Sequence, residues 1–156
     1  MPLSLYNPSL KHACWALLLC TGVFIINGNL SDPNLFNKLL DIVSFTHVLR
    51  LASLPADAPL GHLNPAVFAY VDVEALISLF KPACAIDSSS TIIWVSSTFV
   101  YGLNPTSTPI VESNPIDHLA TLFASGKNTT EEIAYAYRYT YGLSITTLHL
   151  FTDYNP

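Results

Sequence analysis

Two groups of residues in the middle of the chain have types and spacing that could do chemistry. The first follows Ile92 to Val95, a short apolar run with β-branched members that is typical of a strand buried on both faces of a parallel sheet. Directly after it come the hydroxyl residues Ser96, Ser97 and Thr98. In open α/β sheets, ligands bind outside the carboxyl ends of the strands, so these hydroxyls are candidate ligand contacts. They are equally suited to satisfying their own backbone, and the stretch alone leaves both interpretations open.

The second group lies on a helix that the apolar spacing predicts from about Ala120 to Tyr141. Phe123 and Lys127 are four residues apart on it. We therefore expect them on one face, one turn from each other.

A strand-end serine followed about one helix-length later by an aromatic-x-x-x-Lys pair resembles the extended short-chain dehydrogenases/reductases. Within them the chain is most similar to the NAD-dependent epimerase/dehydratase family, and especially to plant-type UDP-glucuronate 4-epimerases. The segments that carry this resemblance are WVSSTFVYGLN, LFASGK with EEIA, YGLSIT and FTDYNP, and before them NPSLKHACWALL, VFIINGNLSD, LLDIVSFTHVLRLAS and NPAVFAYVDVEAL. They look like degraded forms of that family's segments and cover most of the chain.

The resemblance implies an α/β fold. Residues 1–156 would form an incomplete Rossmann-like domain, a doubly wound parallel sheet that lacks its first two strands and the C-terminal sugar-nucleotide domain. No G-x-x-G-x-x-G phosphate-binding turn occurs between Met1 and Asp32. With the family's strand order 3-2-1-4-5-6, we expect a strand from Val23 to Asn27 to lose its neighbour. The next strand, His47 to Leu51, would then have a bare apolar edge.

The family's catalytic positions correspond to Ser97, Phe123 and Lys127. The resemblance implies a tyrosine where Phe123 stands, whose phenolate removes the proton from the sugar 4-hydroxyl while hydride passes to NAD. Ser97 would hydrogen-bond the same oxygen, and Lys127 would lower the tyrosine pKa and bind the nicotinamide ribose. Phenylalanine has no titratable proton, and general-base catalysis supplies ~100- to 10,000-fold in rate. We therefore expect a truncated, catalytically impaired or inactive relative.

The resemblance also implies NAD as cofactor and a UDP-sugar as substrate. The residues at the family's NAD-binding positions are Asn29, Leu30, Leu51, Ala52, Ser96 and Lys127. Asn29 replaces an acidic residue that contacts the adenine amino group, which weakens that contact. Asp72 replaces a family asparagine, and the loop LPADAP lacks the family's substrate-recognising arginine, which puts uronate recognition in doubt.

Two other functions remain open. The helices expected at Asn64 to Phe80 and Ala120 to Tyr141 match the family's dimer contact, so the chain could be a non-catalytic partner that forms homodimers or heterodimers with intact relatives. The apolar run Ala13 to Ile26 imitates a signal-peptide core, which would make it a small membrane-associated or secreted protein. At about fourteen residues the run is shorter than the ~20 that span a bilayer. The resemblance instead makes it a helix end, up to Leu19, followed by the strand.

Composition narrows the functional classes. A hydrophobic share of 51%, a formal net charge of −5 and only six Lys and Arg argue against nucleic-acid binding, which needs a basic face. The histidines and the three cysteines show no metal-ligand spacing, so no metal site is expected, and the cysteines should be reduced and buried. Location stays open between the Golgi membrane, where family members of this type reside, and the cytoplasm, because no membrane anchor is clear.

Helix boundaries are marked by two signals. Asp32 and Pro33 predict the start of a helix that runs to about Asp41, with Asp32 as its N-cap. Lys81 and Pro82 predict the end of the Asn64 to Phe80 helix. A last strand is expected from Ser144 to His149.

Overall fold

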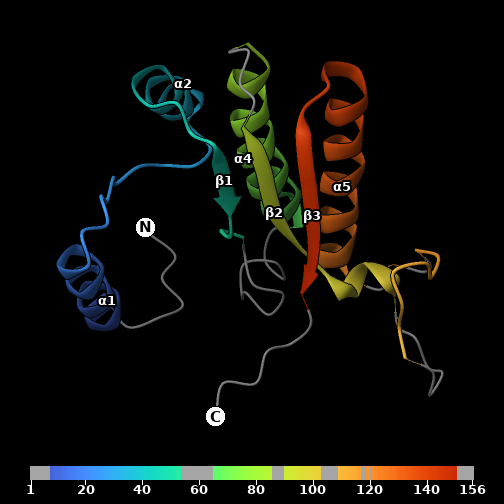
Figure 1. Ribbon diagram of the computed structural model, residues 1–156. Helices are drawn as coiled ribbons and strands as arrows, with labels where there is room; N and C mark the ends of the chain where they lie inside the picture. The colour runs from blue at the N-terminus through green and yellow to red at the C-terminus, as the bar shows by residue number, and fades with distance from the viewer. Residues whose placement is uncertain are drawn as a thin grey trace.

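The computed structural model describes residues 8–53, 65–85, 90–102, 109–116, 119 and 121–150 (Figure 1). The elements in chain order are α1 (Pro8–Cys20), α2 (Pro33–Ile42), β1 (His47–Arg50), α4 (Pro65–Ala85), β2 (Thr91–Ser97), the 3-10 turn η1 (Thr98–Tyr101), α5 (Leu122–Tyr141) and β3 (Ser144–Leu150).

The strands form a three-stranded parallel sheet in the order β1-β2-β3, with α4 and α5 side by side against one face (Figure 1). The register pairs Arg50 with Trp94 and Trp94 with Thr147. This confirms the predicted α/β class and parallel sheet. Within the described residues β1 pairs with β2 alone, and Leu49 and Leu51 are exposed, so the bare apolar edge expected there is also confirmed.

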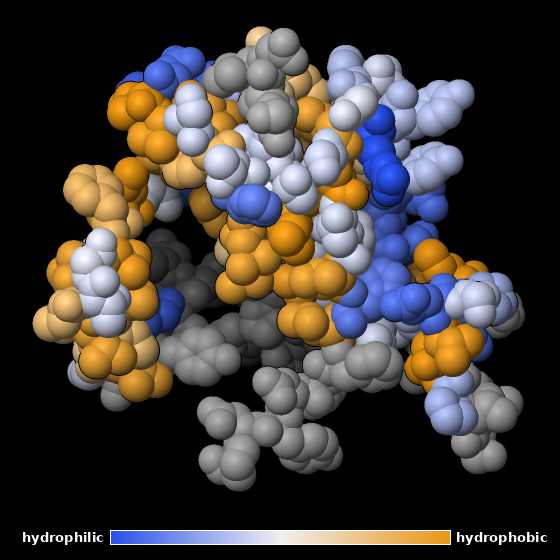
Figure 2. Space-filling view, in the orientation of Figure 1, coloured by the Kyte–Doolittle hydropathy of each residue, from blue (hydrophilic) through white to orange (hydrophobic). Residues whose placement is uncertain are grey.

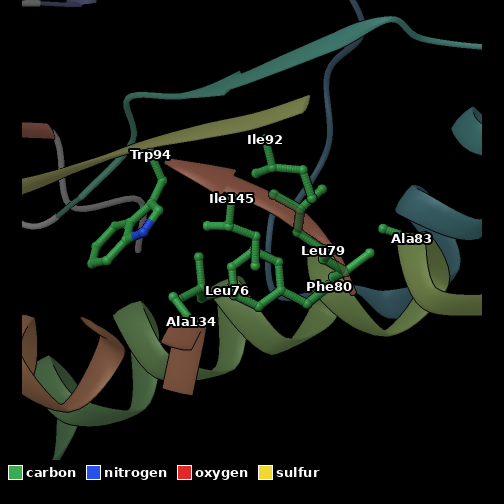
Figure 3. Packing of buried hydrophobic residues seen from close by; sticks show 9 residues of the cluster. Leu76, Leu79, Phe80, Ala83, Ile92, Trp94, Ala134 and Ile145 are labelled. Carbon is green, nitrogen blue, oxygen red and sulfur yellow. The ribbon is translucent and has the colours of Figure 1, made fainter. Parts of the chain in front are cut away.

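The core lies between the sheet and its two helices. Leu76, Leu79 and Phe80 of α4 pack against Ile92 and Trp94 of β2 (Figure 3). Ala83, Ala134, Leu143 and Ile145 complete the cluster. Along β2, alternate residues point into this core, whereas Ile93 and Val95 on the opposite face are only partly buried. The expectation of a strand buried on both faces is therefore only half met.

The helix ends follow local sequence signals. Asp32 is the N-cap of α2 and accepts a hydrogen bond from the Asn34 amide at 2.9 Å, with Pro33 at the start of the helix, as predicted. Thr121 caps α5 in the same way, accepting from the Ala124 amide at 3.1 Å. Gly142 ends α5 with a left-handed φ of 69°, a conformation that favours glycine.

Two predictions are wrong: the strand at residues 23–27 and the end of a helix before Pro82. Residues 23–27 form no strand, because no neighbouring strand among the described residues pairs with them after α1 ends at Cys20. Helix α4 does not stop before Pro82 but runs through it to Ala85. Proline removes one backbone donor, and the buried packing of Phe80 and Ala83 on either side holds the helix together.

Helix α1 has a largely apolar surface. Leu17, Leu19 and the following Phe24 are 60% or more exposed, and Figure 2 shows this hydrophobic surface over α1. Cys14 and Cys20 are exposed free thiols, so the expectation that all the cysteines are buried is wrong. Among the helices of the described residues, none is both long and apolar enough to cross a bilayer.

Candidate functional site

Ser97, Phe123 and Lys127, the residues predicted to occupy the family's catalytic positions, lie near the carboxyl end of β2. Ser97 is the last residue of that strand, and Lys127 reaches it from α5, where its Nζ donates to the Val95 carbonyl at 3.3 Å. The Phe123 ring centroid lies 5.6 Å from the same Nζ. Phe123 also contacts Phe99 of η1 edge-on, with ring centroids 6.0 Å apart. The predicted spacing of one helical turn therefore does place Phe123 and Lys127 next to each other.

Ser97 makes a local backbone contact. Its Oγ accepts a hydrogen bond from the Phe99 amide at 3.3 Å and caps η1. This is the backbone interpretation of the strand-end hydroxyls. The Ser97 side chain therefore fixes the turn that carries Phe99 toward Phe123.

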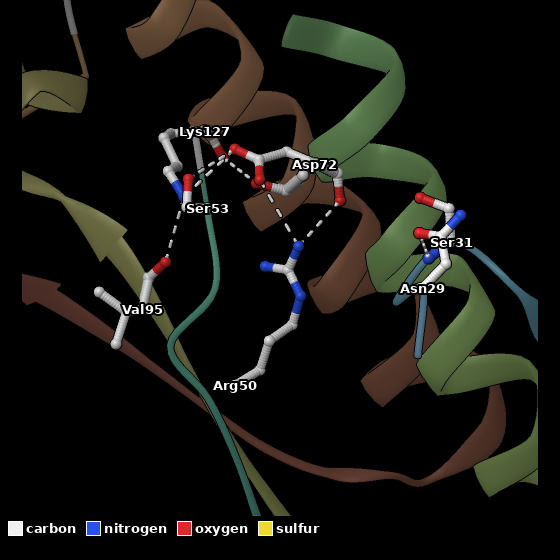
Figure 4. Close-up of polar contacts among 8 residues, drawn as sticks. Asn29, Ser31, Arg50, Ser53, Asp72, Val95 and Lys127 are labelled. Carbon is white, nitrogen blue, oxygen red and sulfur yellow. Dashed lines mark hydrogen bonds and ion pairs between the residues drawn. The ribbon is translucent and has the colours of Figure 1, made fainter. Parts of the chain in front are cut away.

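A buried ionic network holds Lys127. Its Nζ lies 3.3 Å from Asp72 Oδ2, and the two side chains are 2% and 4% exposed. Ser53 donates to the same oxygen at 2.9 Å, and Arg50 Nη2 lies 3.5 Å from Asp72 Oδ1 (Figure 4). We call Arg50, Ser53, Asp72 and Lys127 the Asp72 network. It ties the end of β1 to α4 and α5.

The charges in the Asp72 network do not balance. Two cations share one carboxylate, and within the described part of the chain Nε and Nη1 of Arg50 are buried without a hydrogen-bond partner. Burial lowers the pKa of Lys127, and the attraction of Asp72 offsets part of that change. The pKa of Arg50 is lowered for the same reason, again opposed by Asp72. Among the described residues, Asp72 is therefore the carboxylate that contacts both buried cations, and Glu131 adds a further attraction on Lys127.

From the sequence, Asp72 is recognised only as a replacement for a family asparagine, and Arg50 is not singled out. A signal was available in the spacing of α4. Asp72 lies four residues before Leu76, on the stripe that continues to Leu79, Phe80 and Ala83, all of which are buried. A carboxylate on a core stripe needs a buried cationic partner. Which cation supplies it depends on strand pairing, which the stripe does not reveal.

The predicted cofactor-binding residues are divided between two places. Leu51 and Ala52 follow β1 and are exposed, and Ser96 near the end of β2 is buried with its hydroxyl donated to Glu131. Asn29 and Leu30 are exposed, and Asn29 lies beside α4, apart from Lys127 (Figure 4). Leu51, Ala52, Ser96 and Lys127 therefore lie together at the carboxyl ends of the strands, whereas Asn29 and Leu30 lie outside that group.

The polar groups predicted to contact NAD have internal partners. The Lys127 ammonium points to Asp72 and to the Val95 carbonyl, and the Ser96 hydroxyl to Glu131. The amide oxygen of Asn29 accepts from the Ser31 backbone at 3.1 Å. A ribose or adenine would therefore have to share or displace these contacts.

Comparison with protein families decides the ancestry. The model of the NAD dependent epimerase/dehydratase family matches residues 6–156. The chain belongs to this family. The resemblance inferred from the sequence segments is thereby confirmed.

Curated relatives of this family member include several plant enzymes. UDP-glucuronate 4-epimerase 4 of Arabidopsis thaliana is 41% identical over 97% of this chain and 34% of its own length. UDP-glucuronate 4-epimerase 6 of the same plant is 42% identical over 97% of this chain and 32% of its own length. The chain thus spans about a third of the length of the curated relatives it matches.

Solved structures show the same fold. UDP-glucose 4-epimerase from Bifidobacterium longum, in complex with NAD+ and UDP, superposes with a TM-score of 0.76 at 20% identity, over 92% of this chain and 42% of that one. UDP-glucose 4-epimerase from Thermotoga maritima, with UDP-glucose, gives 0.71 at 21% identity, over 80% and 40%. The sheet and helices described above therefore match part of the Rossmann-like epimerase fold.

We expect Asp72→Asn to destabilise the protein by about 3–5 kcal/mol, because it leaves two buried cations without a counter-charge. Urea unfolding followed by circular dichroism measures the change. Asp41→Asn is the matched control, since Asp41 is exposed on α2. This substitution should change the free energy of unfolding by no more than about 0.5 kcal/mol. Equal effects of the two substitutions would show that the Asp72 network does not hold the fold.

The lowered pKa of Lys127 predicts a pH dependence of stability. In the window just below 10.5, between the folded and unfolded pKa values, the unfolded chain binds more protons, so the free energy of unfolding rises with pH. Lys127→Met removes this contribution and still leaves Arg50 opposite Asp72. The stability of the wild type relative to Lys127→Met should therefore increase as the pH approaches 10.5. If this difference in the free energy of unfolding, measured with urea, stays constant or falls as the pH rises, the lowered pKa of Lys127 is contradicted.

Proposed function

We propose that this chain is a relative of the UDP-glucuronate 4-epimerases that has no 4-epimerase activity of its own. The observation that carries the proposal is the pair Phe123 and Lys127. An unreactive ring stands where the family has its catalytic tyrosine, and the neighbouring ammonium is engaged by Asp72. The 41% identity to a UDP-glucuronate 4-epimerase over 97% of this chain supports the ancestry.

The chemical reason is the missing proton acceptor. Interconversion of UDP-glucuronate and UDP-galacturonate requires a base that takes the proton of the sugar 4-hydroxyl as hydride leaves the same carbon. Phe123 carries no group that accepts a proton, and the loss of a general base costs ~100- to 10,000-fold in rate. Asp72 adds a second obstacle, because its carboxylate binds Lys127 and would oppose the lowering of the pKa of a phenol at position 123.

We expect no turnover of UDP-glucuronate with added NAD, and none after Phe123→Tyr alone, because Lys127 stays paired with Asp72. The assay separates UDP-glucuronate from UDP-galacturonate by chromatography, with UDP-glucuronate 4-epimerase 4 of Arabidopsis thaliana as the positive control. Turnover by the wild type would overturn the proposal. Recovery in the single variant would show that Asp72 does not silence the site.

A thermal melt completes this test by asking whether NAD binds at all. A ligand at ~100 times its dissociation constant stabilises the folded state by about 2.7 kcal/mol, which would raise the midpoint by several degrees. We expect the same melting midpoint with and without NAD, because the side chains predicted to contact NAD already have partners within the protein. An upward shift would mean that the cofactor displaces those partners.

A second function is favoured by the outer face of α5. We propose that the chain associates with intact relatives through α4 and α5. These helices pack on each other, and the resemblance assigns them to the family's dimer contact. Tyr135 and Tyr139 lie one turn apart on α5 and are 68% and 83% exposed. Exposed tyrosines are enriched among residues that anchor protein interfaces.

We expect the tagged chain to co-purify with UDP-glucuronate 4-epimerase 4 of Arabidopsis thaliana when the two are expressed together. The double variant Tyr135→Ser/Tyr139→Ser should reduce recovery by about tenfold or more, as the loss of interface anchors does. Phe24→Ser is the control, because Phe24 is 89% exposed after α1 and far along the chain from α5. Equal recovery with all three forms would exclude this face as the contact.

A further inference from the structure

A cleft of about 880 Å³ opens beyond the carboxyl ends of β2 and β3. It lies between η1, the end of β3, the segment at 110–112 and one side chain of α5. This volume is within the range of small-molecule sites in proteins. Neither Phe123 nor Lys127 is among its lining residues. The cleft is therefore separate from the catalytic positions of the family.

Four polar side chains form a continuous chain of hydrogen bonds at this cleft. The Tyr101 hydroxyl lies 2.7 Å from His149 Nδ1, and His149 Nε2 lies 3.0 Å from Glu131 Oε1. Ser96 donates to that same carboxylate oxygen. The Tyr101 and His149 rings meet edge-on, with centroids 5.2 Å apart. Side chains from β2, η1, α5 and β3 are thus held in one fixed arrangement.

The carboxylate sets the direction of these hydrogen bonds. Because Glu131 can only accept, His149 Nε2 carries a hydrogen, and in the neutral ring Nδ1 is then an acceptor. Tyr101 must therefore donate its hydrogen to His149. Among the described residues no donor reaches the Tyr101 oxygen, so its lone pairs remain for a ligand. Burial, together with Glu131 and Glu112, raises the pKa of Tyr101, so its hydroxyl keeps the proton that this arrangement needs.

The order oxygen, imidazole, carboxylate is that of the acid–base triads of enzymes, in which the carboxylate orients the imidazole and the imidazole orients the oxygen. Here the oriented oxygen is a phenol that lines a cleft. The described lining residues include the carboxylates of Glu112 and Glu131 and no lysine or arginine. An anionic ligand would meet repulsion from both carboxylates.

We propose that this cleft binds a small polyhydroxylated or amino compound that carries no negative charge, with the Tyr101 oxygen accepting a hydrogen bond from it. Glu112, exposed at the rim, accepts from a second hydroxyl or ammonium group of the same ligand. His149 is a positioning residue, because it acts by orienting the Tyr101 hydroxyl. The site is distinct from the proposed function, since a UDP-sugar is an anion.

The test uses three probes that match in size and differ in charge: D-glucosamine, D-glucose and D-glucuronate. Each is titrated into the ¹⁵N-labelled full chain, and resonances of residues 98–101 and 147–150 and of the His149 ring are followed. We expect saturable shifts with affinity falling from glucosamine to glucose, and none with glucuronate. Binding of glucuronate as tight as that of glucosamine, or no saturable shift with any probe, would overturn the proposal.

Variants separate the contact from simple loss of structure. Tyr101→Phe should weaken glucosamine binding by about fivefold, as loss of one hydrogen bond does. His149→Gln should retain binding, because its amide can accept from Tyr101 and donate to Glu131, whereas His149→Leu should weaken it by up to the same fivefold. Tyr139→Phe is the control, since Tyr139 is 83% exposed outside the cleft. If the Tyr101→Phe and His149→Gln variants both bind glucosamine as tightly as the wild type does, the Tyr101 hydroxyl is not the contact.

Discussion

The carboxylate of Asp72 is the group on which the arrangement of the other elements depends. It lies on α4 and binds Lys127 of α5, Arg50 at the end of β1 and Ser53 just beyond it. Removing one partner of a buried ion pair is costly because the other charge stays in a medium that solvates it poorly. A single acidic side chain thus links the two helices to the sheet.

The residues predicted at the catalytic positions have the expected spacing but not the expected chemical groups. Phe123 and Lys127 are adjacent, as a phenol and its activating lysine would be. However, the ring has no hydroxyl, and the ammonium is satisfied by Asp72, by the Val95 carbonyl and by the faces of Trp94 and Phe123. These partners fix the position of the ammonium, and a ribose would have to share or displace them.

The polar cleft beside η1 has the opposite character. The side chains of His149 and Glu131, which form its hydrogen bonds, are partly exposed, whereas those of Lys127 and Asp72 are buried. Its lining carboxylates are opposed by no lining cation among the described residues. Ser96 joins the two regions, since it precedes the η1 cap Ser97 and donates to Glu131. The carboxyl ends of the strands thus carry a closed cationic network and an open acidic cleft.

The sequence by itself determined the family, the α/β class, the parallel sheet and most helix ends, because periodicity, caps and family segments are local properties of the chain. It also placed Phe123 beside Lys127, because four residues make one helical turn. It did not predict that residues 23–27 form no strand, since a strand exists only where a partner pairs with it. Only the tertiary structure brought Arg50 and Lys127 to Asp72, or Tyr101 to His149. These partners are 22, 55 and 48 residues apart in the chain, and their contact depends on strand pairing and helix packing that no short segment encodes.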